Sequence, residues 1–325
     1  MRSDFKENEV LLTNQHTSDV VVSIIMPVNN CQAHIVDAVE SIVHQSFEDW
    51  ELIIVDDCSV DDTLQLIMSF SDLRIRIIKC QDKIGIARAL NVGIENSRGR
   101  FIARMDGDDI AAPERLSKQL EYLSANPDLA LIGCQAQLIA KDGKIIGTKR
   151  KPVSSLLCRW YARYATPLIH PTFFGRREVF INLRGYALLP RAQDFEFITR
   201  VLNLGYRIGN HPECLFYYRI HPISTHRIWT IFESNRIAWM LRRRLNPLRD
   251  QFPPPISQLN LKFVRYEANS RLCSSCFRRF NSVFLGSQGI ILNSFAREIL
   301  FCRLVAKFII ILDRFNMRFP VIRRS

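Results

Sequence analysis

The sequence predicts an α/β fold with a mainly parallel sheet flanked by helices, followed by a basic helical extension. Apolar, β-rich runs alternate repeatedly with segments of helical periodicity between residues 20 and 134. Polar clusters follow three of these runs, as expected where the carboxyl ends of parallel strands form a binding edge. The excess of basic residues lies in the last quarter of the chain.

The first elements are a strand, a helix and a second strand. Residues 20–26 are apolar and β-rich, and Pro27 ends the run, which indicates a buried strand. Residues 33–45 carry apolar side chains at helical spacing, so a helix is expected there. Residues 50–55 form the next apolar run and lead into a pair of aspartates.

The pattern then continues with a helix, a strand and another helix. Ser59 and Asp62 have the spacing of a capping box, which predicts that a helix begins at Ser59. Residues 74–79 read as a short strand and residues 85–94 as a short helix. Ordinary capping is an alternative role for the aspartates before Ser59.

The remaining elements complete the predicted domain. Residues 101–105 form an apolar strand that ends in acids, and Pro113 suits the first turn of the next helix. Later elements are expected as a strand at 129–134, a hairpin over 137–148 turned at Asp142-Gly143, a helix at 193–204 and a strand at 215–221.

The acidic stretch after residues 101–105 is the central candidate site. Asp106 and Asp108 lie one residue apart at a strand end, where both side chains can reach one divalent cation. Mg2+ and Mn2+ prefer carboxylate oxygen, so either ion fits. Gly107 allows a tight or left-handed backbone between them. A solvated Asp-Gly turn is the alternative interpretation.

Composition excludes several classes of protein. Of the 325 residues, 47% are hydrophobic and 23% charged, an ordinary globular profile. Residues 1–19 are polar, so no secretory signal is expected, and no apolar run has membrane-spanning length. The nine cysteines follow no framework pattern, which favours reduced thiols in the cytoplasm. Glycine-rich phosphate loops do not occur, which argues against dinucleotide oxidoreductases and P-loop enzymes.

The charge distribution suggests the domain boundaries. Residues 242–325 hold 16 Lys/Arg and 4 Asp/Glu, whereas the preceding residues hold 28 of each sign. We therefore expect a polar segment at 1–19, the α/β domain at 20–241 and a basic extension at 242–325. Residues 290–319 predict a basic amphipathic helix, which either lies on anionic lipid or packs on the domain. No nucleic-acid-binding module is recognised, and Cys273-x-x-Cys276 lacks the partners of a zinc site.

The order and spacing of several motifs resemble the family 2 glycosyltransferases of GT-A fold, bacterial enzymes of lipopolysaccharide, capsule and O-antigen synthesis. The resemblance extends from about residue 20 to residue 221. The motifs are Val-Ser-Ile-Ile-Met-Pro-Val-Asn-Asn (22–30), Ile-Ile-Val-Asp-Asp-Cys-Ser-Val-Asp-Asp-Thr (53–63), Asn-Val-Gly-Ile (91–94), Met-Asp-Gly-Asp-Asp (105–109), His-Pro-Thr (170–172), Gln-Asp-Phe-Glu (193–196) and Tyr-Arg-Ile-His (218–221).

The resemblance implies a role for each motif. Members of the family bind the nucleotide base with the loop after the first strand and the next acid pair. The implied base contacts here are Pro27, Asn29 and Asp57, with Asp56 beside them. The central acids are implied to contact the ribose of the donor and the metal ion. Asp106 is implied to bind both the donor and the cation, Asp108 is implied to bind the cation, and Asp109 lies next to them. Asp194 matches the catalytic base, and Lys83 and Arg88 either face the diphosphate or are solvated charges.

The implied reaction is an inverting, non-processive transfer of a sugar from a nucleotide sugar, expected to be a UDP-sugar. The acceptor would be a glycan or a lipid-linked sugar, at or near the inner face of the plasma membrane. Gln193 stands where many relatives have Glu, and Glu196 is the rival base. The alternatives are a catalytically silent glycan- or membrane-binding module and, less favoured, a sugar-phosphate nucleotidyltransferase. His170 and His221 are expected to be structural.

Overall fold

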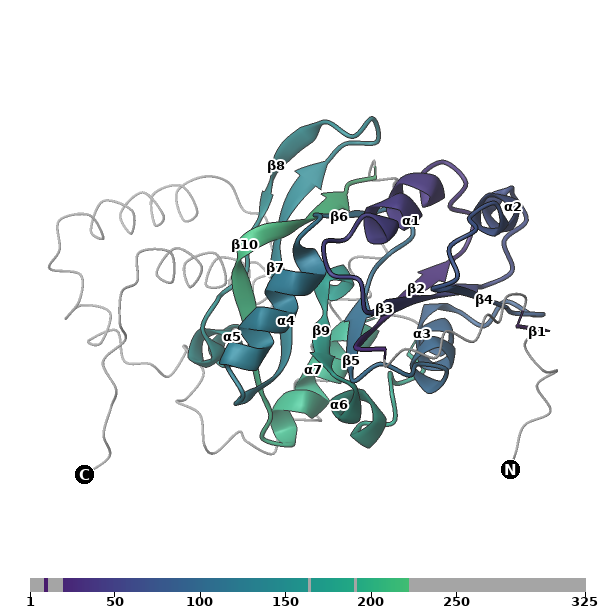
Figure 1. Ribbon diagram of the computed structural model, residues 1–325. Coiled ribbons are helices and arrows are strands. Elements are labelled where there is room, and N and C mark those ends of the chain that lie inside the picture. The colour runs from purple at the N-terminus through teal and green to yellow at the C-terminus, as the bar shows by residue number, and fades with distance from the viewer. Residues whose placement is uncertain (1–8, 11–19, 163–164, 190–191, 222–325) are drawn as a thin grey trace, which may run out of the picture. The chain divides into compact units, whose positions relative to one another are not determined.

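The computed structural model describes residues 9–10, 20–162, 165–189 and 192–221 (Figure 1). The expected basic extension at 242–325, its amphipathic segment at 290–319, and Cys273 and Cys276 lie outside the described residues. Within the described ranges, no helix combines the length and apolarity needed to cross a bilayer.

A mixed sheet forms the centre of the described domain. Its strands are β1 (Glu9–Val10), β2 (Val22–Val28), β3 (Trp50–Asp56), β4 (Ile75–Lys79), β5 (Phe101–Arg104), β6 (Ile110–Ala111), β7 (Leu129–Ile139), β8 (Ile145–Lys149), β9 (Phe174–Arg176) and β10 (Arg207–Arg219). They lie in the order β1-β4-β3-β2-β5-β9-β7-β10-β6, and β8 pairs with β7. The predicted parallel core is confirmed in β4-β3-β2-β5 and in β7-β10, while antiparallel β9 joins these two halves.

Helices cover both faces of the sheet (Figure 1). The helices on the first face are α1 (Ile35–Val43), α2 (Thr63–Met68) and α4 (Arg115–Ala125). The helices on the second face are α3 (Ile86–Glu95), α5 (Ser155–Tyr161), α6 (Arg177–Asn182) and α7 (Gln193–Asn203), with a short 3-10 turn at His170–Thr172. Alternate residues of β2 serve the two cores: Ile24 packs into the first and Ile25 into the second. Because β2 is buried on both faces, its sequence is apolar throughout.

Helix α2 begins later than expected. It starts at Thr63 with Asp62 at the N-cap position, and the Asp62 side chain makes no capping hydrogen bond. The Oγ atom of Ser59 instead accepts a hydrogen bond of 3.0 Å from the backbone N–H of Asn30. The predicted capping box is therefore wrong, because Ser59 ties its loop to the loop after β2.

The two long strands of the second half extend beyond their predicted limits. β7 continues from Leu129 to Ile139, and β10 begins at Arg207, well before the predicted start at 215. Polar side chains interrupt the apolar pattern in both strands. Gln135 and Asn210 are nevertheless buried, because Gln135 donates to the carbonyl of His211 and Asn210 to backbone carbonyls nearby.

Parallel pairing aligns the strand ends that carry the predicted site residues. Val28 of β2 lies opposite Asp56 of β3, and Ile25 lies opposite Arg104 of β5. The backbone N–H of Met105 then donates to the carbonyl of Ile25 at 3.1 Å. The loops after β2, β3 and β5 consequently leave the sheet at one edge, as the sequence predicts.

Candidate active site

Three carboxylates converge at the end of β5. One side-chain oxygen from each of Asp106, Asp108 and Asp109 lies within 4.8 Å of the other two. The side chains of Asp106 and Asp108 are 27% and 31% exposed, whereas Asp109 is buried. Both expected metal ligands therefore share one site with a third acid. A set of carboxylate oxygens suits a hard divalent cation.

Asp109 gives the clearest indication that this cluster can take a cation. Its Oδ1 atom accepts a 2.7 Å hydrogen bond from the backbone N–H of Arg219. Its buried Oδ2 atom has no hydrogen-bond partner within the described part of the chain. Burial, together with the negative charges of Asp106 and Asp108, raises the pKa of Asp109 well above its usual range. An unsatisfied buried carboxylate oxygen costs free energy that a bound cation would offset.

Arg104 holds Asp106 through two hydrogen bonds, of 3.0 and 2.5 Å. The arginine is buried at 2% exposure. Burial raises the pKa of Asp106, and the charge of Arg104 opposes that rise. Arg104 has no role among the sequence-based expectations. Strand alternation could have suggested one, since residues two apart on an extended chain project to the same side.

His221 contacts the acidic cluster from the end of β10. Its Nε2 atom lies 2.6 Å from Oδ2 of Asp108. Two residues earlier, the side-chain Nε of Arg219 donates to the backbone carbonyl of Asp108 at 2.7 Å. His221 is expected from the sequence to be structural, but its ring lies at the candidate metal site. No local signal could identify it, because it lies 113 residues from Asp108 along the chain.

Gly107 lets the acidic turn pack closely against the loop after β2. A Cβ atom at Gly107 would lie 2.7 Å from Cγ1 of Val28 and 3.3 Å from Cδ1 of Ile35. Of the two alternatives expected for Gly107, a tight or a left-handed backbone, the left-handed one is not adopted. The position needs glycine because there is no space for a side chain.

On the β2–β3 side, a network of hydrogen bonds shapes the expected nucleotide loop. Nδ2 of Asn29 donates to the carbonyl of Asp57 at 2.7 Å, and Nζ of Lys83 donates to Oδ1 of Asn29 at 3.0 Å. The Asp57 carboxylate accepts from the backbone N–H groups of Ile84 and Gly85 at 2.6 and 2.9 Å. Asp57 still has acceptor capacity, since a carboxylate offers about four lone-pair sites.

Three other residues that were expected to contact the nucleotide-sugar donor lie in positions different from those of Asn29 and Asp57. Asp56 is fully buried, and its carboxylate accepts the backbone N–H of Ser59 at 3.2 Å. Pro27 is a buried residue of β2, opposite Val55 of β3. Arg88 is partly buried in the first half of α3. Asn29 and Asp57 thus form the centre of this loop, and Asp56 supports it from beneath.

Asp194 approaches the cluster from the other half of the sheet. It lies in the first turn of α7, directly after Ala192, whose backbone is left-handed with φ of 59°. Burial lowers the pKa of Lys149, and the charges of Asp109, Asp194 and Asp106 oppose that fall. The expected base Asp194 and the expected metal ligand Asp106 therefore both act electrostatically on Lys149.

The rival base is occupied by another interaction. Nε and Nη2 of Arg200 donate to the two carboxylate oxygens of Glu196 at 2.6 and 2.7 Å. The Glu196 side chain is only 8% exposed. Arg200 also donates to the backbone carbonyls of Leu183 and Gly185, in the segment between α6 and α7. Through Arg200, the Glu196 carboxylate is therefore connected to that segment. Asp194 is the more accessible carboxylate of α7.

His170 behaves as expected for a structural histidine. Its Nε2 atom lies 3.2 Å from the hydroxyl of Tyr186, and its ring packs edge-on against Phe173. Burial, with a further contribution from the charge of Arg104, lowers the pKa of His170 well below its usual range. The ring is therefore neutral near pH 7.

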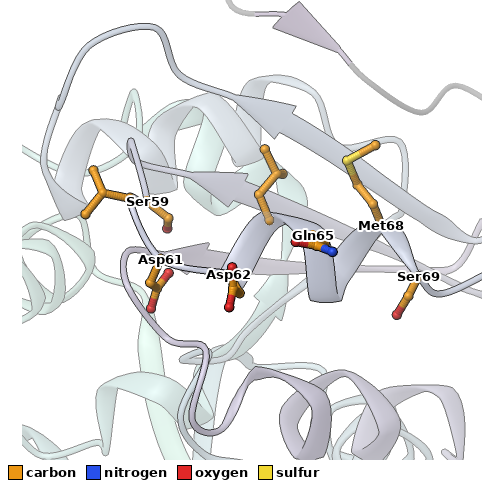
Figure 2. Close-up of a pocket in the computed structure, with 8 residues that line it drawn as sticks. Ser59, Asp61, Asp62, Gln65, Met68 and Ser69 are labelled. Carbon is orange, nitrogen blue, oxygen red and sulfur yellow. The ribbon is translucent and has the colours of Figure 1, made fainter.

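A surface hollow of about 530 Å³ lies elsewhere, against α2. Figure 2 shows its lining by Ser59, Asp61, Asp62, Gln65, Met68 and Ser69. None of the expected site residues lines it, so we do not connect it with the chemistry of the acidic cluster.

Comparisons with known proteins identify the family of the chain. The family model described as Glycosyl transferase family 2 matches residues 23–184. A glycosyltransferase of Haemophilus influenzae is 31% identical over 69% of this chain and 72% of its own length. The O-antigen biosynthesis glycosyltransferase WbnJ of Escherichia coli is 30% identical over 64% of this chain and 82% of its own length.

Solved structures show the same fold at low sequence identity. TarS of S. aureus, residues 1–349 with UDP-GlcNAc, superposes with a TM-score of 0.55 at 19% identity, covering 68% of this chain and 66% of TarS. The mannosyltransferase PcManGT of Pyrobaculum calidifontis, with GDP-Man and Mn2+, gives 0.56 at 17% identity, covering 95% and 91%. The predicted GT-A fold is thereby confirmed. The chain belongs to the family 2 glycosyltransferases.

Proposed function

We propose that the protein is a metal-dependent, inverting glycosyltransferase that adds one sugar per encounter from a UDP-sugar to a glycan or lipid-linked acceptor. The observation that carries the proposal is the acidic cluster, in which the buried Oδ2 of Asp109 has no partner among the described residues. A nucleoside diphosphate leaves with a large negative charge, which such a site can neutralise through a bound cation.

Asp106 and Asp108 would hold Mn2+ or Mg2+, with Asp109 and His221 completing the set. Mn2+ is favoured by the likeness to PcManGT, which was solved with that ion. The bound cation would supply Lewis-acid stabilisation of the departing diphosphate. Arg104 and Arg219 keep the carboxylates in place, since each contacts the acidic turn directly.

Asn29, Asp57 and Pro27 would form the pocket for the nucleotide base, with Asp56 supporting the loop. Nζ of Lys83 lies 3.0 Å from Oδ1 of Asn29, and Arg88 lies in the first turn of the neighbouring helix α3, so both suit the diphosphate side. UDP is our preferred nucleotide because TarS was solved with UDP-GlcNAc. The complex of PcManGT with GDP-Man makes GDP the alternative to test.

Asp194 would act as the general base. It takes the proton of the acceptor hydroxyl as that oxygen bonds to the anomeric carbon, and the carbon–oxygen bond to the diphosphate breaks with its electron pair. Attack opposite the leaving group inverts the anomeric centre. Such base assistance is typically worth about 10²–10⁴ in rate.

We expect the enzyme to act in the cytoplasm, peripherally at the inner face of the plasma membrane, with no nucleic-acid partner. Support comes from the relatedness to WbnJ, an O-antigen biosynthesis enzyme. The excess of 16 Lys/Arg over 4 Asp/Glu in residues 242–325 would favour anionic lipid.

The test is a donor-hydrolysis and transfer assay with a panel of nucleotide sugars, with and without Mn2+. Thermal shifts of the same protein with UDP and GDP measure nucleotide binding independently. Asp108→Asn and Asp194→Asn should abolish transfer while the protein stays folded. The exposed hairpin residue offers a matched control, Asp142→Asn. Tight membrane binding without hydrolysis or transfer of any donor would instead support the silent module.

A further inference from the structure

The tip of the β7–β8 hairpin exposes two consecutive isoleucines. Ile145 is 61% exposed and Ile146 is 58% exposed, at the start of β8. Ile145 and Gly147 each have a partner residue on β7, but Ile146 between them has none, because the pairing shifts there. Such a β-bulge redirects side chains at the edge of a sheet. Figure 1 shows the hairpin projecting from the rest of the sheet, so both apolar side chains are left in solvent.

The exposed charges around the two isoleucines are mostly positive. Lys141 and Lys144 in the turn and Arg150 after β8 are exposed, and Asp142 is the single acid between residues 140 and 150. Nζ of Lys144 lies 2.9 Å from Oδ2 of Asp142, but these side chains are 83% and 54% exposed. An ion pair as exposed as this one holds its partners only weakly. Apolar side chains beside Lys and Arg are the combination by which amphipathic segments bind the interface of an anionic bilayer.

A second copy of the chain fits this tip poorly. In a symmetric contact through the tip, Lys141, Lys144 and Arg150 would face their own equivalents, and like charges repel. Stable protein interfaces also bury about 800 Å² on each partner, which two isoleucine side chains do not provide. A bilayer needs no matching surface, because apolar side chains enter the acyl boundary while basic ones stay among the headgroups.

The stem of the hairpin is attached to the acidic turn through Arg219. Nη1 of this buried arginine donates to the backbone carbonyls of Ala140 and Lys141 at 3.2 and 3.0 Å. Its Nε atom donates to the carbonyl of Asp108 at 2.7 Å, and its backbone N–H donates to Oδ1 of Asp109 at 2.7 Å. One side chain therefore connects the exposed hairpin with the proposed metal site, so a surface that binds the tip is held close to that site.

We propose that the tip of the β7–β8 hairpin docks on the surface of an anionic lipid bilayer and holds the acidic cluster at the membrane. The side chains that make the contact are Ile145 and Ile146, which enter the headgroup–acyl boundary, and Lys141 and Lys144, which pair with lipid phosphates. The inference deepens the proposed function and rests on it, because a lipid-linked acceptor keeps its sugar at the surface that the tip contacts.

The test measures binding of the full chain to sedimented vesicles of phosphatidylcholine alone, or of phosphatidylcholine and phosphatidylglycerol in equal parts. We expect wild-type protein to bind the mixed vesicles, and the double variant Ile145→Ser/Ile146→Ser to bind them at least about tenfold more weakly. Lys141→Gln/Lys144→Gln should lose about fivefold for each lysine on mixed vesicles only, because the neutral lipid offers no net charge. Every variant retains residues 242–325, so a difference between variants reports on the hairpin.

Leu156→Ser is the matched control. Leu156 lies in the first turn of α5 and is 61% exposed, as Ile145 is, so this variant should bind the vesicles like wild type. The Tm of each variant shows that it is folded.

Three results would overturn the proposal. The first is equal binding of mixed vesicles by wild type and the double isoleucine variant, and the second is a wild-type protein that binds neither vesicle. The third is self-association that the isoleucine substitutions abolish while vesicle binding stays unchanged, which would make the tip a protein interface. Failure of the proposed function is a separate result: hairpin-dependent vesicle binding without transfer from any nucleotide sugar leaves the docking surface in place. Conversely, transfer to a soluble acceptor without vesicle binding would keep the proposed function and remove the docking surface.

Discussion

Arg104 and Asp106 form a two-point ion pair at the end of β5, and the arginine is buried. The carboxylate expected to bind the metal is therefore already neutralised by a neighbour two residues away. This pair offsets the repulsion among the three clustered acids. It also means that a cation and Arg104 compete for the charge of Asp106.

Replacing Arg104 should make the stability of the protein depend on the cation. Arg104→Gln leaves three close carboxylates without their buried counter-charge, at a cost of roughly 2–4 kcal/mol because Asp106 is partly exposed. We expect a lower Tm without metal and a larger rise with Mn2+ than in wild type. The measurement is Tm across a Mn2+ titration. An Mn2+ shift equal to that of wild type would mean that Arg104 does not balance the cluster.

Gly107→Ala should disturb the acidic turn. The added methyl would lie 2.7 Å from Cγ1 of Val28, so the turn must move, at a cost of about 1–3 kcal/mol. We expect a lower Tm and weaker Mn2+ binding. Gly147→Ala is the matched control, since its Cβ would meet Leu138 at an ordinary 3.7 Å. Equal behaviour of the two variants would contradict the packing argument.

The sequence predicted the parts of the site that local pattern determines. An apolar run followed by Asp106 and Asp108 indicates a strand end with two carboxylates, and their convergence at 4.8 Å or less agrees with that reading. Asn29 and Asp57 follow neighbouring parallel strands, so their approach was also predictable.

The other contacts of the site depend on pairing between strands that lie far apart in the sequence. No local sequence pattern indicates this pairing. His221 reaches Asp108 only because β10 pairs with β7 and β6. The charges of Asp109, Asp194 and Asp106 act on Lys149 because β8 folds back on β7 as a hairpin. The hairpin itself was predicted, but its direction relative to the acids was not, since that depends on the place of β7 in the sheet.

Glu51 should make stability sensitive to acid. Burial raises the pKa of Glu51, but hydrogen bonds from Ser23 and the Arg98 amide, with the charges of Arg98 and Arg76, lower it below the ordinary 4.5 overall. A lowered folded pKa means that this stabilisation is complete above the unfolded pKa and is lost as the pH falls through the folded value. Glu51→Gln should cost about 2–3 kcal/mol at pH 7.

Urea unfolding between pH 3 and pH 7 checks this prediction. The difference in unfolding free energy between wild type and Glu51→Gln should shrink as the pH falls. A difference that is independent of pH would show that the charge of Glu51 is not the source of the stabilisation. Exposed Glu48→Gln is a suitable control for general charge effects.

Substitutions of the two carboxylates of α7 should have different effects, one on the catalytic rate and the other on stability. Asp194→Asn removes the proposed base, so kcat should fall by about 10²–10⁴ while Tm is nearly unchanged. Glu196→Gln breaks the two-point pair with Arg200, so Tm should fall, with a loss of about 1–2 kcal/mol, while kcat changes little. Both variants are measured for kcat and Tm with the same donor. The reverse pattern, a large loss of kcat in Glu196→Gln with little change in Asp194→Asn, would contradict the assignment of Asp194 and favour Glu196 as the base.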